Sequence, residues 1–166
     1  MVRAFSPPPS NASIASLKMI KVKRIDHVAI AVADRDAATA SLGTLFGLLP
    51  GAREHVAGQA TDVAFLHPAH SGPADRPAEG DATALEICAP RGNAALDRFL
   101  ARRGPGLHHV CFAVDDLPGA LAELKAAGVR LIDETPRPGA RGHQVAFLHP
   151  ASTGGVLFEL CAGSDA

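Results

Sequence analysis

A seven-residue segment, VAFLHPA, occurs twice in this chain, at residues 63–69 and again at residues 145–151. Two further blocks repeat in the same order, DHVAIAVAD at 26–34 with HHVCFAVDD at 108–116, and LEICA at 85–89 with FELCA at 158–162. The first copy is longer because it carries an extra segment rich in Gly, Pro and Asp, residues 71–82, which is typical of a loop. Three blocks kept in order predict two copies of one structural module.

Each copy has the residue pattern of a βαβββ module. An alternating strand runs to an aspartate, Asp34 or Asp116, that can cap a following helix. The apolar stripes at helical spacing are Ala38, Leu42, Leu45 and Leu49 in the first copy, and Leu117, Leu121 and Leu124 in the second. The three short strands that follow are predicted at 52–57, 61–67 and 83–89, and at 129–133, 143–148 and 155–161. Because neither module can bury its sheet well alone, we predict an α+β fold in which two βαβββ modules form one curved mixed sheet.

The boundaries of the domain follow from the repeat. We predict a single domain over 24–162, made of module one at 24–90, a linking helix at 93–103 and module two at 106–162. Residues 1–23 are basic and free of Asp and Glu, and we expect a disordered extension there, with Met19 as an alternative start. A mitochondrial transit peptide has a similar bias, although the prolines at 7–9 would break its helix.

Composition excludes several classes of protein. The chain has 166 residues, which suits one domain, and no apolar run approaches the roughly 18–20 residues of a membrane span. A formal net charge of −1 gives no reason to expect nucleic acid or an anionic membrane as a partner. The three cysteines lie in apolar runs without metal-binding spacing and are expected to be reduced, buried thiols of a cytoplasmic protein.

Four polar side chains fall on one face of the predicted strands. Side chains alternate between the two faces of a strand, so His27 lies opposite its bulky neighbour Val28. The same rule places Glu86, His109 and Glu159 opposite bulky apolar residues, on faces whose other members are small. Small neighbours leave room for a ligand beside these four side chains.

The four side chains together have the chemistry of a metal site. Each one alone is more typical of a hydrogen-bonded strand histidine or a solvated glutamate, but a carboxylate in an apolar strand is costly unless it is paired or bound to a metal. Two imidazoles and two carboxylates suit Co²⁺, Mn²⁺, Ni²⁺, Fe²⁺ or Zn²⁺, with open positions for water or substrate. We therefore predict that His27, Glu86, His109 and Glu159 bind one divalent ion on the concave face of the sheet.

Four segments resemble the methylmalonyl-CoA epimerase family within the vicinal oxygen chelate (glyoxalase/bleomycin-resistance) superfamily. They are IDHVAIAV (25–32), GLHHVCFAVDD (106–116), GVRLIDETPRPGARGHQVAFLHP (128–150) and STGGVLFEL (152–160). The likeness runs from about residue 24 to residue 162 and implies the paired βαβββ fold. It also implies metal ligands at the four positions above, with Glu86 standing where the family has Gln or Glu.

The resemblance implies interconversion of the (2R) and (2S) epimers of methylmalonyl-CoA. Such chemistry needs a Lewis acid that stabilises an enolate, and proton donors and acceptors on both faces of the α-carbon. Glu159 is expected as one catalytic acid/base and Asp62 as the other, although Asp62 is one methylene shorter than the family's Glu and is equally typical of a solvated edge residue. The expected substrate contacts are a hydrogen bond from Gln144, backbone amides around Ser152, Thr153 and Gly154 for the carboxylate, and Arg137 and Arg141 for the CoA phosphates.

The resemblance further implies an acyl-CoA partner and a homodimer, which is common in the family. Two other functions stay open: a glyoxalase I-like lyase that uses the same four ligands on a glutathione hemithioacetal, and a metal-free binding protein of the antibiotic-sequestration type. The ending HPASTGGVLFEL favours the epimerase over the lyase, and a metal-free protein would leave the two His and two Glu in repeat register unexplained. The chain has no Tyr, which argues against the extradiol dioxygenases of the same fold.

Overall fold

The computed structural model describes residues 20–69 and 82–163, so most of the predicted extension and of the 71–82 loop lies outside the described residues. The described residues form two compact units. The N-terminal unit contains Asp26–His108 with Gly139–Arg141, and the C-terminal unit contains residues 20–25, His109–Pro138 and residues 142–163. Within the described residues, no helix is long and apolar enough to cross a membrane.

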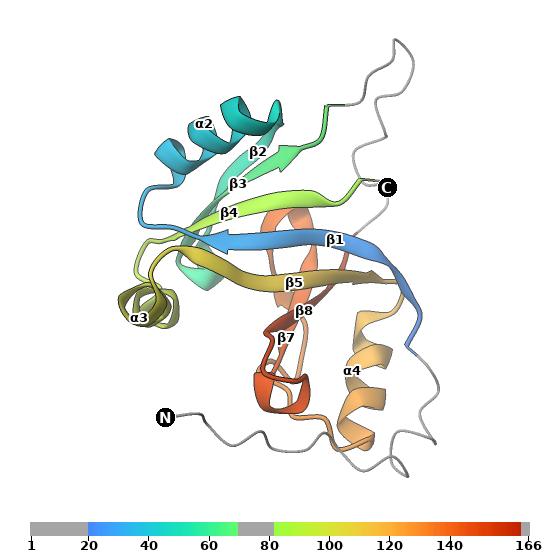
Figure 1. The fold of residues 1–166 in the computed structure, drawn as a ribbon. Coiled ribbons are helices and arrows are strands. Elements are labelled where there is room, and N and C mark those ends of the chain that lie inside the picture. The colour runs from blue at the N-terminus through green and yellow to red at the C-terminus, as the bar shows by residue number, and fades with distance from the viewer. Residues whose placement is uncertain (1–19, 70–81, 164–166) are drawn as a thin grey trace. The chain divides into compact units, whose positions relative to one another are not determined.

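The N-terminal unit holds a four-stranded mixed sheet with α2 on one face (Figure 1). Its elements are most of β1 (Val22–Ala31), α2 (Arg35–Phe46), β2 (Leu49–Val56), β3 (Thr61–His67), β4 (Ala84–Pro90) and α3 (Ala94–Arg103). The strand order is β2-β3-β4-β1. β1 runs parallel to β4, and the other two pairs are antiparallel.

Local chemistry sets both ends of α2. The Asp34 side chain accepts a hydrogen bond from the Ala37 N–H at 2.9 Å, which confirms the predicted N-cap. At the other end Gly47 has a φ of 64°, and its N–H donates to the carbonyl of Gly43. This left-handed conformation closes the helix at little cost only because the residue is a glycine.

Of the four residues predicted to form the buried stripe of α2, the structure packs only two against the sheet. Ala38 and Leu42 pack against the sheet, as predicted. Leu45 and Leu49 are instead 70% and 52% exposed. The helix ends at Phe46, and Leu48, which follows the turn, packs into the same cluster in their place.

The C-terminal unit repeats this plan. Its elements are the greater part of β5 (Gly106–Val114), α4 (Leu117–Ala126), β6 (Arg137–Pro138), β7 (Gln144–Leu148) and β8 (Phe158–Ala162). The strand order is β5-β8-β7-β6, with β5 parallel to β8 and the other pairs antiparallel. Asp116 caps α4 by accepting from the Gly119 N–H at 2.9 Å, and Gly128 follows the helix with a φ of 80°. The predicted α+β class with two βαβββ modules is therefore confirmed.

Residues 129–133 do not form the strand that the repeat predicts. The segment makes only an isolated bridge at Leu131. Beyond it the Phe147 carbonyl accepts from two successive N–H groups, those of Ile132 at 2.8 Å and Asp133 at 3.2 Å. The Asp133 carboxylate then accepts from the Phe147 N–H at 2.9 Å, in the place of a backbone carbonyl. A side chain thus ends the ladder, and pairing resumes only at β6.

The outer strands begin and end differently from the prediction. Ile20 already packs against the core of the C-terminal unit and β1 begins at Val22, so the ordered domain starts before residue 24. β8 begins at Phe158 rather than at residue 155, because Gly154 and Gly155 have φ values of 72° and 88°. A strand cannot include that backbone conformation.

Each sheet has a helix-covered face and an opposite face. In the C-terminal unit α4 packs its buried leucines against β7 and β8, while Cys111 and Cys161 lie on the opposite face. In the N-terminal unit the face opposite α2 is filled beside Ala29 and Ala31, in part by Leu96 of α3. The sequence predicts space for a ligand beside Ala29 and Ala31, but Leu96 fills part of that space. All three cysteines are buried and none is in a disulfide, as expected.

We predict that Leu66→Ala lowers the free energy of unfolding by about 2–5 kcal/mol, since it empties a core position that is 1% exposed. The control is Leu45→Ala, which removes the same atoms from a side chain that is 70% exposed and is expected to change stability by about 0.5 kcal/mol or less. Urea unfolding measures both. Equal losses would contradict the core assignment.

Candidate metal and substrate site

In the N-terminal unit, His27 and Glu86 form a buried pair on the face opposite α2. The parallel pairing of β1 with β4 sets His27 level with Ala84 and Glu86 level with Ala29. His27 Nε2 lies 3.6 Å from Glu86 Oε2, and the two side chains are 6% and 8% exposed. Zinc ligands of these types lie about 2.0–2.2 Å from the ion, so two atoms at this separation can bind the same ion.

In the C-terminal unit, His109 and Glu159 form the equivalent pair. They come from the parallel strands β5 and β8. His109 Nε2 lies 2.9 Å from Glu159 Oε2, and both side chains are buried. This separation suits a hydrogen bond, and it also suits neighbouring ligands of an octahedral ion. Each of the four predicted ligands is therefore buried beside its partner within its own unit.

Each histidine also packs edge-on against the phenylalanine of the repeated VAFLHPA segment. The ring centroids of His27 and Phe65 are 5.8 Å apart at an interplanar angle of 79°. Those of His109 and Phe147 are 5.1 Å apart at 82°. An edge-to-face contact restrains each imidazole, because other ring orientations lose it. The phenylalanine of the repeated VAFLHPA segment therefore has the same structural role in both copies, next to the histidine of each His/Glu pair.

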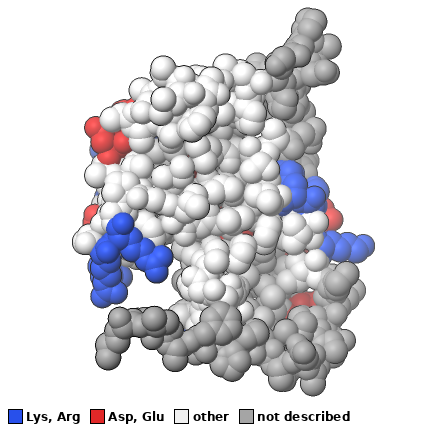
Figure 2. All heavy atoms as spheres, in the orientation of Figure 1, with Lys and Arg blue, Asp and Glu red and all other residues white. Residues whose placement is uncertain are grey.

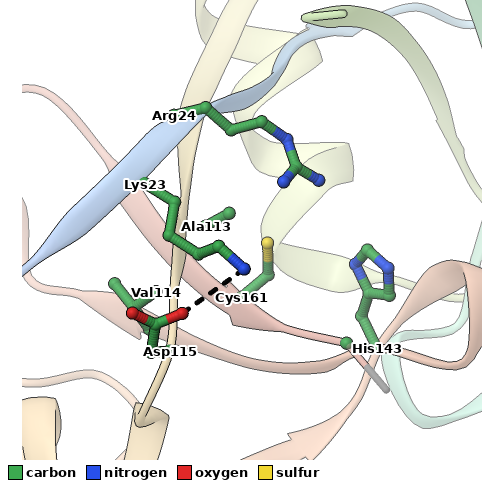
Figure 3. A pocket seen from close by; sticks show the side chains of 8 residues that line it. Lys23, Arg24, Ala113, Val114, Asp115, His143 and Cys161 are labelled. Atoms are coloured by element: carbon green, nitrogen blue, oxygen red, sulfur yellow. Dashed lines mark ion pairs between the residues drawn. The ribbon is translucent and has the colours of Figure 1, made fainter. Parts of the chain in front are cut away.

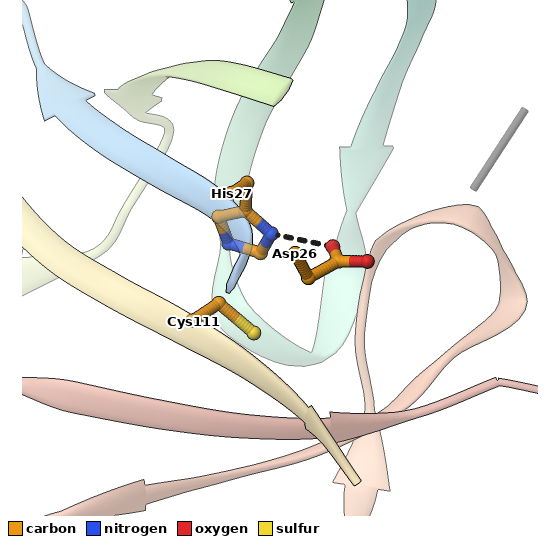
Figure 4. Close-up of side chains that lie close together, drawn as sticks. All are labelled: Asp26, His27 and Cys111. Atoms are coloured by element: carbon orange, nitrogen blue, oxygen red, sulfur yellow. Dashed lines mark hydrogen bonds and ion pairs between the residues drawn. The ribbon is translucent and has the colours of Figure 1, made fainter. Parts of the chain in front are cut away.

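Asp26 is a functional residue that the sequence analysis missed. Its carboxylate Oδ2 lies 2.9 Å from His27 Nδ1, as Figure 4 shows, and the residue is 2% exposed. A carboxylate can only accept, so Nδ1 carries the hydrogen and Nε2 keeps the lone pair that a metal ligand needs. The adjacent acid and histidine in IDHV were visible in the sequence, but strand alternation places neighbours on opposite faces and so hid the contact.

Two opposing effects act on the Asp26 carboxyl. Burial by itself raises its pKa, because the charged form loses water. The hydrogen bond from His27 and the positive charge of Arg141 outweigh burial and hold the pKa of Asp26 far below its usual range. Asp26 therefore stays ionised at neutral pH and keeps its role as an acceptor.

Arg141 is not placed as a phosphate-binding residue. Its Nη2 donates to Asp26 Oδ2, its backbone N–H donates to Glu54 Oε1 at 2.8 Å, and its guanidinium carbon lies 4.2 Å from the centroid of the Phe65 ring. The guanidinium is thus committed to a buried carboxylate and an aromatic face. The predicted contact of Arg141 with a CoA phosphate has no support from this position, because its guanidinium already meets the buried Asp26 carboxylate.

Arg137 lies on the face that carries His109. β6 pairs Arg137 with Val145, and the Arg137 guanidinium carbon is 5.3 Å from the Phe147 ring centroid. Its Nε also donates to Asp133 Oδ1 at 3.0 Å. The side chain is about one-third exposed, so Arg137 keeps a position from which it can meet a substrate.

Asp62 lies on the wrong face for its predicted role. It shares the α2-covered face of β3 with Leu66, whereas Phe65 shares the face of Glu86, its partner in β4. The Asp62 carboxylate lies 2.7 Å from His55 Nδ1 and 3.4 Å from Arg91 Nη1, and the His55 hydrogen bond lowers the pKa of Asp62. A proton acceptor for a site beside His27 does not fit this position. On the correct face, β2 contributes Glu54.

Gln144 is placed in the same way as Asp62, its equivalent in the repeat. It pairs with Ala162 at the end of β8, on the face covered by α4. There it lines a shallow pocket together with Leu117 and Pro118 of α4. The structure therefore does not bring Gln144 to the His109 face, and its predicted contact with substrate has no support from its position.

The predicted carboxylate cradle around Ser152, Thr153 and Gly154 is already hydrogen-bonded. The N–H of Ser152 donates to the His149 carbonyl at 2.9 Å, and those of Thr153 and residue 155 donate to the Pro150 carbonyl at 3.2 and 2.8 Å. The Ser152 hydroxyl accepts from a backbone N–H, and the Thr153 hydroxyl donates to a carbonyl. The turn thus uses the N–H groups of Ser152 and Thr153 for its own closure, and their predicted contact with substrate stays a prediction.

A small polar pocket lies elsewhere in the C-terminal unit (Figure 3). It has a volume of about 70 Å³. Lys23, Arg24, Asp115 and His143 line it, with the Cys161 thiol at its wall. Lys23 Nζ lies 3.3 Å from Asp115 Oδ1, so part of its charge is balanced. None of the predicted site residues lines this pocket.

Two exposed basic side chains lie at the C-terminal end of α3. The helix ends in Arg102 and Arg103, both exposed, and on the face drawn in Figure 2 a blue patch lies over this helix while most of the surface is uncharged. Charge on this surface is therefore local, in agreement with a formal net charge of −1.

Comparisons with known proteins identify the family. The model of the glyoxalase/bleomycin resistance protein/dioxygenase superfamily matches residues 26–147. The chain belongs to this superfamily. It is 33% identical to mitochondrial methylmalonyl-CoA epimerase of Mus musculus over 160 residues, covering 95% of this chain and 83% of the relative. It is 32% identical to ethylmalonyl-CoA/methylmalonyl-CoA epimerase of Cereibacter sphaeroides over 142 residues, 84% of this chain and 97% of the relative.

Among solved structures of this superfamily, a methylmalonyl-CoA epimerase from Streptomyces coelicolor in complex with 2-nitronate-propionyl-CoA is similar to this chain. The TM-score is 0.78 at 31% sequence identity, over 88% of this chain and 98% of that one. The match therefore extends over both βαβββ modules and confirms the fold predicted from the repeat.

We predict that Asp26→Asn lowers the free energy of unfolding at pH 7 by about 2–4 kcal/mol, because it leaves the Arg141 guanidinium without its buried carboxylate. The folded pKa of Asp26 is depressed, so its stabilisation is fully present above the unfolded pKa of about 3.9 and is lost as the pH falls below that value. Urea unfolding should show the gap between wild type and variant shrinking from pH 7 to pH 3. Asp97→Asn, at an exposed position of α3, is the control, and a gap independent of pH would contradict the account.

Proposed function

We propose that this chain is a methylmalonyl-CoA epimerase, which interconverts the (2R) and (2S) epimers by moving the proton on the α-carbon. The observation that carries the proposal is the pair of buried His/Glu contacts, one in each repeat, in a chain whose relatives over most of its length are named as epimerases of this substrate. A solved relative is described as bound to methylmalonyl-CoA, which supports an acyl-CoA substrate.

We propose that His27, Glu86, His109 and Glu159 hold one divalent ion. The donor set fits, because His27 presents Nε2 as a lone pair and both carboxylates are buried, where a charge needs a partner. Imidazole and carboxylate ligands suit Co²⁺, Mn²⁺, Ni²⁺, Fe²⁺ or Zn²⁺. When bound, the ion supplies Lewis-acid stabilisation of the negative charge that develops on the thioester oxygen as the α-proton leaves.

The residues of the chain then position the substrate and carry the proton. Glu159 has a second carboxylate oxygen beside the one that faces His109, and we propose that it takes the α-proton from one face of the carbon, or delivers a proton to that face in the reverse direction. Inversion of the centre requires that a second group deliver the proton to the opposite face. We propose that Arg137, which stacks on Phe147 and is about one-third exposed, binds the CoA phosphates. The phenylalanines keep water away from the imidazoles and so strengthen each ionic contact.

Two further expectations concern assembly and location: the dimer is implied by the resemblance, and the location by the reduced cysteines and the composition of residues 1–23. We propose that the protein is a homodimer, which light scattering tests as a mass of about 34 kDa against 17.1 kDa for one chain. We also propose a cytoplasmic location, or the mitochondrial matrix if residues 1–23 act as a transit peptide, and a fluorescent fusion of the whole chain distinguishes the two.

We predict that the metal-loaded protein converts (2R)- or (2S)-methylmalonyl-CoA to the mixture of epimers in D₂O and incorporates deuterium at the α-carbon. Proton removal and return from solvent require this exchange, and mass spectrometry and NMR detect it. Absence of exchange, together with turnover of the methylglyoxal–glutathione adduct, would assign the chain to the glyoxalases. Tight antibiotic binding without turnover of either substrate would favour the sequestration function.

We predict that Glu159→Ala lowers both the metal affinity and the rate of exchange by at least ~100-fold, since it removes a ligand and a proton acceptor together. Asp62→Asn is the control, because this carboxylate lies on the opposite face of its sheet, and it should change both quantities by about threefold or less. Elemental analysis and the exchange assay measure the two effects. Full metal occupancy in Glu159→Ala would refute the ligand assignment.

A further inference from the structure

A chain of contacts in the N-terminal unit runs from the segment Gly139–Arg141 to the imidazole of His27. The Arg141 backbone N–H donates to Glu54 Oε1 at 2.8 Å, and Arg141 Nη2 donates to Asp26 Oδ2. The same Asp26 oxygen lies 2.9 Å from His27 Nδ1. One arginine is therefore held at its backbone by a side chain of β2, while its guanidinium holds the carboxylate that meets the histidine.

The backbone of Arg141 shows that this position is constrained. Its φ and ψ are 56° and 27°, in the left-handed region that residues with a side chain rarely adopt. Such a conformation persists only where surrounding contacts determine it. Here the contacts are the Glu54 hydrogen bond, the Asp26 ion pair and the stack on the Phe65 ring at 4.2 Å. All of them act on this one residue.

Two partners of Arg141 contact the His27 ring, the Asp26 carboxylate at Nδ1 and the Phe65 ring. Phe65, on which the Arg141 guanidinium lies, also packs edge-on against the His27 ring. Arg141 therefore restrains the imidazole in two ways, through the Asp26 carboxylate at Nδ1 and through the aromatic ring beside it. Nε2 faces Glu86 Oε2 at 3.6 Å.

We propose that Asp26 and Arg141 are positioning residues that fix the tautomer and the ring orientation of His27. In this way the Gly139–Arg141 segment sets the metal affinity of a site to which it contributes no ligand. A carboxylate at Nδ1 selects the tautomer with the hydrogen on Nδ1, and the guanidinium keeps that carboxylate in place. The expected effect of Asp26 and Arg141 on metal affinity rests on the proposed function. Their expected effect on the tautomer of His27 is independent of it.

The C-terminal unit offers a matched control. Arg137 stacks on Phe147, the repeat equivalent of Phe65, with its guanidinium carbon 5.3 Å from the ring centroid. Its carboxylate partner is Asp133, which accepts from the backbone N–H of Phe147. Arg137→Ala thus removes a similar stacked arginine and ion pair without touching the carboxylate that contacts His27.

The first measurement is the tautomer of His27 in the metal-free protein, read from long-range ¹H–¹⁵N NMR spectra at pH 8. We expect hydrogen on Nδ1 in the wild type and in Arg137→Ala. In Asp26→Asn and Arg141→Ala we expect a shift of the population toward hydrogen on Nε2, with partial rescue in Arg141→Lys, which restores a charge but not the planar stack. A wild-type His27 with its hydrogen on Nε2 would overturn the proposal.

The second measurement is the affinity of the chelator-treated protein for Zn²⁺ and Co²⁺, by competition with a chromophoric chelator. We expect a loss of about 10–100-fold in Asp26→Asn and in Arg141→Ala, as is typical when the partner of a ligating histidine is removed. We expect a change of about twofold or less in Arg103→Ala, whose guanidinium carbon lies 5.8 Å from the centroid of the Phe99 ring and not over a ring that packs on a proposed ligand. Circular dichroism confirms that each variant is folded, and Arg141→Lys stands in for Arg141→Ala if the latter unfolds.

The outcomes separate this inference from the proposed function. An Arg141→Ala protein that is folded, with unchanged tautomer and unchanged affinity, would overturn the positioning role even if the wild type is an active epimerase. A wild type that binds no metal but shows the Nδ1 tautomer, lost in Arg141→Ala, would refute the proposed metal site while supporting the control of His27 by Asp26 and Arg141.

Discussion

A carboxylate buried in a sheet must be given a partner, and this requirement organises the site. Glu86 and Glu159 lie among apolar strand residues with almost no exposure, and each faces the Nε2 of a buried histidine. An ionised group in such a place is destabilising unless opposite charge or hydrogen-bond donors surround it. The same demand recurs at Asp26, which draws in both His27 and Arg141. At Asp26 the His27 N–H and the Arg141 guanidinium meet this requirement, and at Glu86 and Glu159 we propose that the metal ion meets it.

The repeat explains why the arrangement occurs twice. In both units the parallel strand pair carries the His and the Glu, and the neighbouring antiparallel strand supplies a phenylalanine that packs edge-on against the imidazole. In both units an arginine then covers that ring. The units differ in what the arginine pairs with, since Arg141 meets the carboxylate on His27 whereas Arg137 meets Asp133. The repeat thus supplies two similar His/Glu pairs, and in the N-terminal unit the His27 ring also contacts an arginine-paired carboxylate.

The sequence predicts this site as far as strand alternation and the repeat extend. Those two rules place His27, Glu86, His109 and Glu159 on one face in repeat-equivalent positions. That each His/Glu pair lies on adjacent parallel strands comes from the structure. The same alternation puts Asp62 on the face of β3 that carries Leu66. Because α2 packs against Leu66, this face is the helix-covered one, away from Glu86. Neither rule predicts the partners of Arg141. A loop brings residue 141 to Asp26 and Glu54, which are distant from it in the sequence. Asp133 ends a predicted strand for a similar reason, because its side chain takes the place of a backbone acceptor.

The central claim is that the two His/Glu pairs bind one ion together, and anomalous diffraction from crystals grown with Co²⁺ tests it most directly. The account predicts one anomalous peak per chain, with a nitrogen of His27 and of His109 and an oxygen of Glu86 and of Glu159 each within about 2.3 Å of it. A peak elsewhere in the chain, or a separate ion at each pair, would contradict it.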